Sequence, residues 1–510
     1  MKARWLLVPA LALLATGSAV SKTAQHVRIT MTVSACRAAP VSVEPGVTSF
    51  AVVNRTRRAR LFTIAGRRTR YVRPGRSRTL RVNFSRTGVY RYFCISRGPR
   101  RVVRTGVVGV RPRPVPAPHR IGVRQVSGAG EFYDRITGAR FVPRGNTYLR
   151  RADQELPGGH VVFRGSTFIE GRYDPARIES ALAAMRADGY DSVRFILDVV
   201  CRQGCLGDFA AVGLRAAYLA NLTDFLHRAK RHGLYVLLAN DGPLPAGTTW
   251  AAQMEAECCT TFAGTNLYYL TAGGIEGARL FWKALLNALI ARRAPLDIVF
   301  GYSLVAEAYY DGNEPPLSLT SGTVTTANGR TYDLASPAER QRMMDENLVT
   351  YADRVRAAIH EVDPTALVGM GFLWPQGPNP ARGGDPRLIR TGTVLRDSAL
   401  DFVDLHLHPG LELSFPQYVE NFELPPLTAK PVVLGEYGAF KSSAETAQKA
   451  ADMLVSWQRE SCAYGFDGWL LWSWDTTEEA SGAPELWTAL DEGGVIKRAL
   501  SPAGRPDPCA

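Results

Sequence analysis

From residue 121 onward the sequence alternates apolar, strand-like runs with amphipathic stretches. The strand-like runs are 140–144, 192–197, 235–240, 297–305, 366–372, 402–407, 431–434 and 468–472. Between them, apolar residues recur every three or four positions, as on one face of an α-helix, in 175–188, 214–232, 277–293, 337–362 and 444–461. Eight strands alternating with helices predict a (β/α)8 TIM barrel over residues 121–510, with 309–336 as a long loop. The alternative, a doubly wound open sheet, lacks a Gly-x-Gly-x-x-Gly after a strand.

The segment before residue 121 follows a different pattern. Short alternating strands are expected at 27–33, 48–54, 61–65, 77–84, 88–94 and 106–110, with turns at Pro45-Gly46 and Pro74-Gly75. They predict an all-β sandwich over residues 25–110. Residues 111–120 have a proline at every second position from 112 to 118, which predicts a stiff extended linker.

Charge divides the chain at the same place. Residues 22–120 hold 22 arginines and Lys22 against one acid, Glu44. Because Lys2 and Arg4 add +2 and the whole chain carries +14, residues 121–510 carry −10. The basic segment is either a solvated surface that favours solubility or a surface that binds a polyanion, such as an anionic cell-surface polymer. Few aromatic residues stand among the arginines, so sequence-specific nucleic-acid recognition is not expected.

The first 19 residues have the three parts of a secretory signal peptide. Lys2 and Arg4 precede an apolar run at 5–15, and small residues follow at 17–19. The run is shorter than the roughly 20 apolar residues of a membrane-spanning helix. We therefore expect a secreted, extracellular protein without a transmembrane segment.

Eight cysteines form an even set, which in an oxidising compartment favours disulfides over metal ligation. Their positions in the chain suggest the pairs Cys36–Cys94, Cys201–Cys205 and Cys462–Cys509. Cys258 and Cys259 have no obvious assignment.

Two carboxylates stand at the ends of buried strands of the predicted barrel. Glu307 ends the fourth strand-like run and Glu436 ends the seventh. Reactive groups of such barrels lie at the carboxyl ends of the strands. Cleavage of a glycosidic bond needs two carboxylates there, one to protonate the leaving oxygen and one to attack the sugar or activate water. The alternative is that each is an ordinary loop acid near a strand end.

Six motifs, in order, resemble glycoside hydrolase family 5, the cellulase-like group of clan A. They are Arg140-Phe-Val-Pro-Arg-Gly-Asn146, Ser192-Val-Arg194-Phe, Gly301-Tyr-Ser-Leu-Val-Ala-Glu307, Asp404-Leu-His406-Leu-His408-Pro, Pro431-Val-Val-Leu-Gly-Glu436-Tyr-Gly and Gly468-Trp-Leu-Leu-Trp472-Ser-Trp474. The resemblance spans nearly all of residues 125–502. It implies a retaining glycosidase that acts on a β-linked polysaccharide or glycoside without a cofactor or metal.

The resemblance also implies roles for individual residues. Glu307 would be the acid/base, which holds its proton while neutral, and Glu436 would be the nucleophile. Arg194 would orient the Glu436 carboxylate and keep it ionised. The candidate substrate-binding residues are Arg194, His406, His408, Tyr302, Trp472, whose ring would form the floor under the sugar, and Trp374, for which simple packing is an equal alternative.

Three positions depart from the family pattern. The family has Asn before the acid/base, where it binds the sugar 2-hydroxyl, but here that residue is Ala306. A literal Asn313-Glu314-Pro315 follows, which we treat as chance because it lies in the predicted loop. Strand three ends in Ala239-Asn240-Asp241 instead of a histidine, and His408 replaces a tyrosine. These changes keep open a second hypothesis, a non-catalytic carbohydrate-binding barrel.

The basic segment resembles the cupredoxin fold, on Asn54, Pro74-Gly75 and the motif Gly88-Val-Tyr-Arg-Tyr-Phe-Cys94. Copper in that family needs two histidines, a cysteine and often a methionine. Here Arg60 stands at the first histidine, arginines and Pro99 surround the second, and Val107 replaces the methionine. Only Cys94 is left, so we expect no copper.

Overall fold

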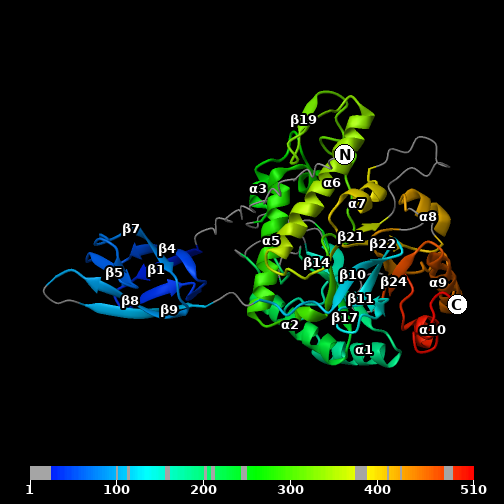
Figure 1. Ribbon diagram of the computed structural model, residues 1–510, viewed down its shortest axis with the longest axis horizontal. Helices are drawn as coiled ribbons and strands as arrows, with labels where there is room; N and C mark the ends of the chain where they lie inside the picture. The colour runs from blue at the N-terminus through cyan, green and yellow to red at the C-terminus, as the bar shows by residue number, and fades with distance from the viewer. Residues whose placement is uncertain are drawn as a thin grey trace, which may run out of the picture. The chain divides into compact units, whose positions relative to one another are not determined.

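The computed structural model describes two compact units, residues 1–114 and 115–510 (Figure 1). Its described residues are 25–98, 102–111, 115–155, 161–199, 204–207, 213–242, 250–373, 388–410, 413–424, 428–475 and 486–510. The expected signal peptide lies outside them. Within the described ranges, no helix combines the length and the apolar character needed to cross a membrane.

The N-terminal unit consists of two β-sheets. One has the order β2 (Cys36–Ala39), β1 (Gln25–Met31), β4 (Gly46–Asn54), β7 (Ser77–Phe84). The other has the order β3 (Ser42–Val43), β9 (Val103–Val110), β8 (Gly88–Ser96), β5 (Arg60–Ile64), β6 (Arg67–Arg68). Alternate residues of the strands are buried in one common core that includes Ile29, Phe50, Phe62 and Val108. The predicted all-β N-terminal unit is confirmed.

A disulfide links the two sheets of this unit. It joins Cys36 of β2 to Cys94 of β8, as expected, and both cysteines are buried. Cys94 is therefore bonded to sulfur and does not stand as a free thiolate. Arg60, at the position of the first copper histidine, is buried, and its Nη1 donates a hydrogen bond to the Thr32 carbonyl at 2.7 Å.

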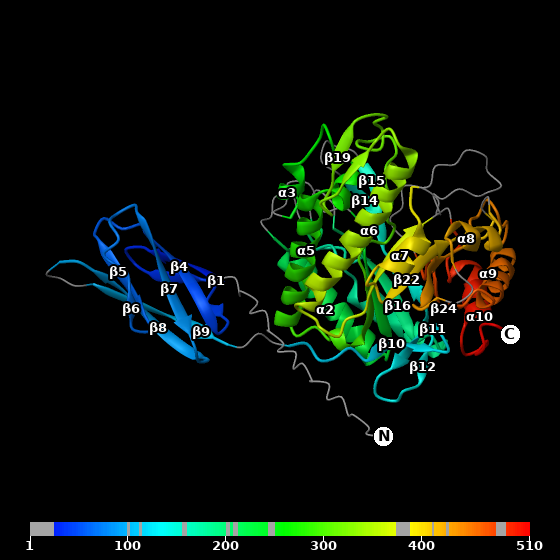
Figure 2. The ribbon, with the colours of Figure 1, turned by 45° about the horizontal axis from the view of Figure 1, so that its top comes forward.

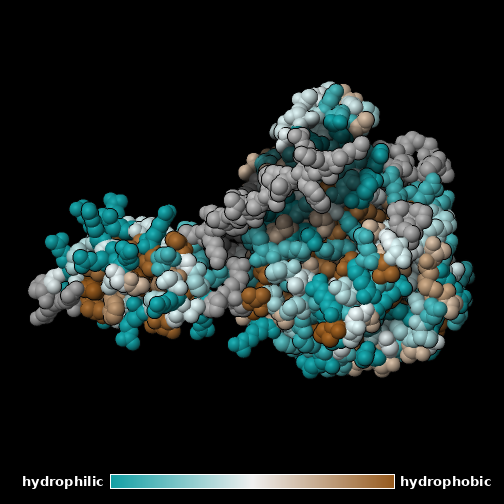
Figure 3. Space-filling model, in the orientation of Figure 1, coloured by the Kyte–Doolittle hydropathy of each residue, from teal (hydrophilic) through white to brown (hydrophobic). Residues whose placement is uncertain are grey.

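The surface of the N-terminal unit is strongly basic. Of the 18 arginines described between residues 25 and 111, all but Arg60 are exposed. None of the 18 forms an ion pair with another described residue. Figure 3 shows hydrophilic side chains projecting from this unit, with hydrophobic residues between them.

The C-terminal unit contains a closed, eight-stranded parallel barrel (Figure 2). Its strands, in order around the barrel, are β13 (Arg144–Thr147), β16 (Ser192–Leu197), β17 (Tyr235–Asn240), β18 (Val299–Ser303), β21 (Val368–Leu373), β22 (Phe402–Leu407), β23 (Val432–Tyr437) and β24 (Phe466–Leu471). The predicted (β/α)8 barrel is confirmed, because eight parallel strands form a closed barrel in which they follow one another in sequence order.

The first predicted barrel strand, 140–144, is misplaced. Only Arg144 belongs to the barrel strand β13, whereas β12 (Arg140–Phe141) pairs with β11 (Ala129–Asp134), which pairs with β10 (Ile121–Val126). Phe132 and Phe141 of this small sheet pack on Phe300, near the amino end of β18. The small sheet therefore closes the barrel at the amino ends of the barrel strands. The run 140–144 was predicted as a barrel strand, but its first residues belong to this small sheet.

Helices follow the barrel strands. They are α1 (Pro175–Ala187), α2 (Ala216–Arg231), α5 (Ala272–Ala291), α6 (Pro337–His360), α7 (Thr391–Asp397), α8 (Phe415–Asn421), α9 (Ala447–Cys462) and α10 (Asp491–Leu500), with the short α3 (Ala252–Glu255) and α4 (Asn266–Leu270) before α5. Local sequence determines where several of these helices begin. Asp174, Ser336 and Thr446 accept backbone N–H bonds as N-caps of α1, α6 and α9. Pro175 and Pro337 then occupy the first helical turn, where proline is tolerated.

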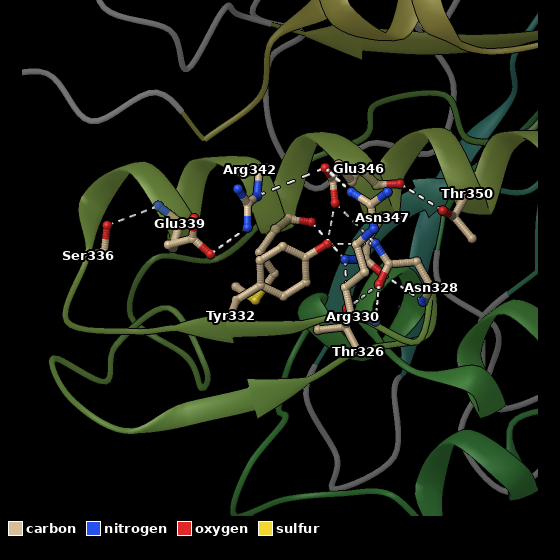
Figure 4. Close-up of polar contacts among 11 residues, drawn as sticks. Thr326, Asn328, Arg330, Tyr332, Ser336, Glu339, Arg342, Glu346, Asn347 and Thr350 are labelled. Atoms are coloured by element: carbon tan, nitrogen blue, oxygen red, sulfur yellow. Dashed lines mark hydrogen bonds and ion pairs between the residues drawn. The ribbon is translucent and has the colours of Figure 1, made fainter.

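Two hairpins extend the loops at the carboxyl ends of the strands. One pairs β14 (Arg151–Glu155) with β15 (Val161–Gly165), and the other pairs β19 (Thr323–Thr325) with β20 (Thr331–Asp333) within the predicted loop 309–336. Figure 4 shows how the second hairpin is tied to α6. Glu346 accepts hydrogen bonds from the Tyr332 hydroxyl at 2.5 Å and from Arg330 at 2.6 Å, and Asn347 donates to Thr326 at 2.8 Å. The predicted long loop therefore contains a β-hairpin that side-chain hydrogen bonds hold against α6.

Disulfides also stabilise the C-terminal unit. The expected pair Cys462–Cys509 ties the chain end to α9. Cys258 and Cys259, which had no assignment, are bonded to each other. Cys205 is disulfide-bonded, but its expected partner Cys201 lies outside the described residues.

Candidate active site

Three barrel strands and one strand-end loop bring four polar side chains together. Arg194 comes from β16, His406 from β22 and Glu436 from β23, whereas Glu307 lies four residues after the end of β18. His406 and Glu436 stand near the carboxyl ends of their strands, and Arg194 stands near the middle of its strand. The group therefore lies on the barrel's inner side toward the face where the sequence predicted the chemistry.

The two glutamates lie close to each other and share contacts with His406. An oxygen of Glu307 and an oxygen of Glu436 are within 4.8 Å. His406 Nδ1 lies 3.0 Å from Glu307 Oε1 and 3.6 Å from Glu436 Oε1. Arg194 donates a hydrogen bond from Nη1 to Glu436 Oε1, and its Nη2 lies 3.3 Å from His406 Nε2. Four of the residues that the sequence singled out thus form one connected cluster.

The two glutamates differ in exposure. The Glu436 side chain is only 6% exposed and contacts the fully buried Arg194. The Glu307 side chain is 41% exposed. One carboxylate is therefore sunk in the barrel against a guanidinium group, and the other can meet a molecule that arrives from solvent.

The pKa of His406 is raised above its ordinary value. Burial lowers its pKa, but the negative charges of Glu436 and Asp404, the 3.5 Å contact with Asp404 Oδ1 and the hydrogen bond to Glu307 outweigh burial and raise the pKa to about 10. An imidazole with this pKa carries a proton on each nitrogen at neutral pH. Glu307 consequently accepts a charge-assisted hydrogen bond from Nδ1.

The pKa directions of the two glutamates are opposite to those expected from sequence. Burial alone would raise the pKa of Glu307, but the hydrogen bond and charge of His406, with Arg194, lower it. Burial raises the pKa of Glu436, even though Arg194 and His406 oppose the shift. The expected arrangement was a neutral Glu307 beside an ionised Glu436. In this structure the protonated His406 favours an ionised Glu307.

His408 is a buried, neutral imidazole. Burial and the nearby charge of His406 lower its pKa to about 4. Its Nδ1 lies 3.0 Å from the Gly438 carbonyl and must donate the proton in that contact, because a carbonyl oxygen only accepts. Nε2 is left as an acceptor.

Trp472 and Ala306 belong to one apolar wall. Trp472 is partly buried and packs against a cluster formed by Leu149, Ile196, Ala239 and Ala306. The position where the resemblance expects an amide therefore carries a methyl group among other apolar side chains. Ala239, from the altered third strand, lies in the same wall.

Two other sequence candidates do not join the cluster. Tyr302 is fully buried, packs edge-on against Trp282 of α5 and donates a hydrogen bond to Asp363 at 3.1 Å. Its side chain points out of the barrel toward the helices, because alternate residues of a strand face opposite sides, so its assignment to substrate binding is corrected. Trp374 lies outside the described residues.

The literal Asn313-Glu314-Pro315 is separate from the cluster. Gly264 lies against the Glu314 side chain, and the Glu314 carbonyl accepts a hydrogen bond from Asn266. Glu314 is thus packed into the loop region by α4.

Sequence reasoning missed Asp404. This side chain is fully buried, 3.5 Å from His406 Nε2 and 3.9 Å from Arg194 Nε. The signal was available, because residues two apart on a strand share a face and Asp404 is two residues before His406. An aspartate on the buried inner side of a strand is rare unless it is paired, so its position there indicates a charged partner.

Glu307, His406 and Glu436 are also the described residues whose ligand atoms are close enough together to hold a metal ion. A histidine protonated on both nitrogens has no lone pair for a metal. The guanidinium group of Arg194 bonds Glu436 and lies 3.3 Å from His406 Nε2, so a metal ion would meet a fixed cation there, and we assign no metal to the cluster.

Comparisons with known proteins support the fold. No protein-family model and no curated protein matches the chain. Among solved structures, it is similar to the endo-1,4-β-mannanase of Rhizomucor miehei, with a TM-score of 0.50 and 14% identity over 75% of this chain and 98% of that one. An exo-β-1,4-mannosidase from Opitutaceae bacterium strain TAV5 gives 0.48 and 18% over 76% of this chain but only 63% of its own length, less than two thirds. The endo-1,4-β-D-mannanase of Thermotoga petrophila RKU-1 gives 0.46 and 15%, covering 71% and 99%. This chain therefore has the (β/α)8 barrel fold found in the Rhizomucor miehei β-mannanase, preceded by an all-β unit.

Proposed function

We propose that this protein is a retaining glycoside hydrolase of family 5 that cleaves a β-linked glycan or glycoside. The observation that carries the proposal is the approach of the Glu307 and Glu436 carboxylate oxygens to within 4.8 Å on the inner side of the barrel. Retaining enzymes hold their two carboxyl groups about 5–5.5 Å apart, whereas inverting enzymes need roughly 6.5–9.5 Å to admit a water between them.

The proposed mechanism has two displacements. Glu436 attacks the anomeric carbon and forms a glycosyl ester, while Glu307 gives its proton to the departing oxygen. Glu307, now ionised, takes a proton from water, whose oxygen attacks the anomeric carbon and releases Glu436. The buried Glu436, oriented by Arg194, suits the nucleophile, and the exposed Glu307 suits the group that exchanges protons with the leaving group and water.

Glu307 must be protonated for the first displacement. The Glu307 carboxyl is 41% exposed, so a bound sugar would remove water from it and raise its pKa from the lowered value it has here. Three carboxylates, from Glu307, Glu436 and Asp404, face the two cations Arg194 and His406, and one added proton makes this group neutral. We infer that substrate binding places this proton, taken up from solvent, on Glu307.

Trp472 and its apolar wall supply the floor for the sugar in this proposal. An aromatic ring suits the C–H face of a pyranose ring. Since Ala306 offers no hydrogen bond to the 2-hydroxyl, this side chain contributes none of the transition-state binding that the amide supplies in the family. The first substrate to test is β-1,4-mannan, on the name of the Rhizomucor miehei relative.

We further propose that the chain is secreted. The support is the three-part signal at residues 1–19 and the disulfides in both units, since such bonds form in oxidising compartments. The proposed organisation is a signal peptide at 1–19, a cupredoxin-like sandwich without copper ligands at 25–110, a linker at 111–120 and the hydrolase domain at 121–510.

The test is release of reducing sugar from β-mannan, β-glucan, xylan and aryl β-glycosides by the purified full-length chain. The Glu436→Ala variant should lose activity by about 10³-fold or more. Glu314→Ala is the matched control, because it removes a nearby carboxylate outside the cluster and should leave activity unchanged. The proposal also requires the first-formed product to keep the β-anomeric configuration by ¹H NMR, and an α-product would contradict it.

The alternative is a carbohydrate-binding barrel without activity, favoured by the methyl group of Ala306 and the altered wall around it. It predicts that none of the four substrate classes is cleaved while one of them still binds the folded chain. Isothermal titration calorimetry with mannohexaose and cellohexaose separates this outcome from simple inactivity.

For the N-terminal unit we propose binding to an anionic cell-surface polymer. Its support is the set of 17 exposed arginines without described ion-pair partners. Inorganic polyphosphate is the probe, and binding by the full chain should weaken roughly tenfold or more between 50 and 500 mM NaCl. Substituting Arg67, Arg68 and Arg70 by Gln should weaken it, whereas the matched change of Arg330, Arg342 and Arg354 on the barrel should not. Absence of binding at low salt overturns the proposal.

A further inference from the structure

Asp404 is a fully buried carboxylate beside the proposed catalytic glutamates, and the double displacement gives it no step. It lies on β22, and the neighbouring strand β23 makes room for it with Gly435. A Cβ atom on Gly435 would stand 1.6 Å from Asp404 Oδ1, so any other residue there would collide with the carboxylate. The fold therefore accommodates this acid specifically.

The carboxylate of Asp404 faces two cationic side chains. Its Oδ1 lies 3.5 Å from His406 Nε2 and its Oδ2 lies 3.9 Å from Arg194 Nε. Neither oxygen has a close, well-aligned hydrogen bond from a described residue. An uncompensated carboxylate at this depth would be costly, so its stabilisation must come from the charges of these two neighbours.

The two cations need a counter-charge. Arg194 Nη2 and His406 Nε2 are 3.3 Å apart. If His406 is doubly protonated, both atoms are donors and the two positive charges repel. If His406 is neutral with its proton on Nδ1, Nε2 can accept a hydrogen bond from Arg194 and no third group is required. Which state is present is decided by the negative charge beside them.

We propose that Asp404 is a positioning residue whose buried carboxylate holds His406 in its doubly protonated form and steadies Arg194 against Glu436. His406 then donates from Nδ1 to Glu307 at all pH values where the enzyme would work. The charged or titratable groups that face His406 are Asp404 on its own strand, Glu307, Glu436, Arg194 and the neutral His408. Of these, Asp404 alone has no other role in the proposed reaction or in the wall of the site.

The inference deepens the proposed function, but its test reads the proton on an imidazole and does not require turnover. The full-length chain, labelled with ¹⁵N-histidine, is titrated from pH 5 to 10.5, and His406→Gln assigns the signal among the eight histidines. In the wild type, both His406 nitrogens should stay protonated above pH 8. In Asp404→Asn the titration midpoint should fall by about 1–3 pH units, the effect of one nearby charge.

Asp363→Asn is the matched control. Asp363, in the connection between α6 and β21, is also a fully buried aspartate next to a histidine, with an oxygen 2.7 Å from His119 Nε2, but it lies on the outer side of the strands with Tyr302. This variant should leave the His406 midpoint unchanged, which separates the charge effect from a general loss of packing.

Two results overturn the proposal. One is an unchanged His406 midpoint in folded Asp404→Asn. The other needs no variant and decides the matter even if Asp404→Asn fails to fold: a neutral His406 in the wild type at pH 8. Neither result bears on glycan cleavage, which the Glu436→Ala experiment tests separately.

Discussion

All but one of the described arginines of the N-terminal unit are exposed and form no described ion pair, whereas Arg144 and Arg194 of the barrel are buried among polar partners. Arg144 donates three hydrogen bonds to the carbonyls of residues 500, 505 and 506, and Arg194 contacts Glu436, His406 and Asp404. A solvated guanidinium group is free to meet a partner but adds little to stability. A buried one is fixed in place, and removing it leaves its partners uncompensated. The same residue type thus serves two purposes, according to its surroundings.

The largest effect on this contrast is expected from Arg194→Ala. Glu436 and Asp404 would lose their guanidinium partner while buried, so the free energy of unfolding should fall by about 3–5 kcal/mol. Denaturant unfolding followed by tryptophan fluorescence measures this. A change below 1 kcal/mol would show that water or a rearranged side chain replaces the guanidinium group.

The small sandwich should depend strongly on its disulfide. Replacing Cys36 and Cys94 together by Ser should cost this unit about 2–5 kcal/mol, because the bond closes a long loop around a small core. Calorimetry of the full chain should show an early transition for the sandwich and an unchanged transition for the barrel. Replacing Cys462 and Cys509 is the matched control and should move the barrel transition instead.

Protonation of His408 should lower the free energy of unfolding of the barrel by about 3 kcal/mol. The pKa of His408 is about 4 when folded and 6.5 when unfolded. The unfolded chain therefore binds the proton more readily, so this stability is complete above pH 6.5 and is lost as pH falls toward 4. Between pH 7 and 4.5, the barrel transition of the wild type should therefore fall relative to that of His408→Gln, which lacks the titrating imidazole, and calorimetry of both proteins measures the difference. The sandwich, with Glu44 as its one acid, should change little.

The smallest effect is expected from a single surface arginine. Arg81→Ala on β7 should change the free energy of unfolding by no more than about 0.5 kcal/mol, since the side chain is exposed and makes no described ion pair. The measurement is the same denaturant titration as for Arg194→Ala. A fall in the free energy of unfolding above 1 kcal/mol would mean that Arg81 has a structural partner. The difference between exposed and buried arginines would then not hold at this position.

Much of the fold could be predicted from local sequence. The runs 192–197, 235–240 and 402–407 coincide with β16, β17 and β22, since an apolar strand buried on both faces is a continuous signal. The first strand was misplaced because Arg140 and Phe141 pair with β11 below the barrel, a non-local contact that the apolar pattern does not reveal. The hairpin in 309–336 was missed because its strands are only three residues long.

The sequence by itself determined the barrel, the basic all-β unit and the order of Arg194, Glu307, His406 and Glu436 along the chain, because hydrophobic period and strand ends are local properties. Tertiary structure alone decided that Tyr302 packs against α5 and how closely Asp404 approaches His406 and Arg194. It also reversed the expected pKa directions of the two glutamates. Charge interactions depend on distances of a few ångströms between residues up to 242 positions apart, and only the closed barrel sets those distances.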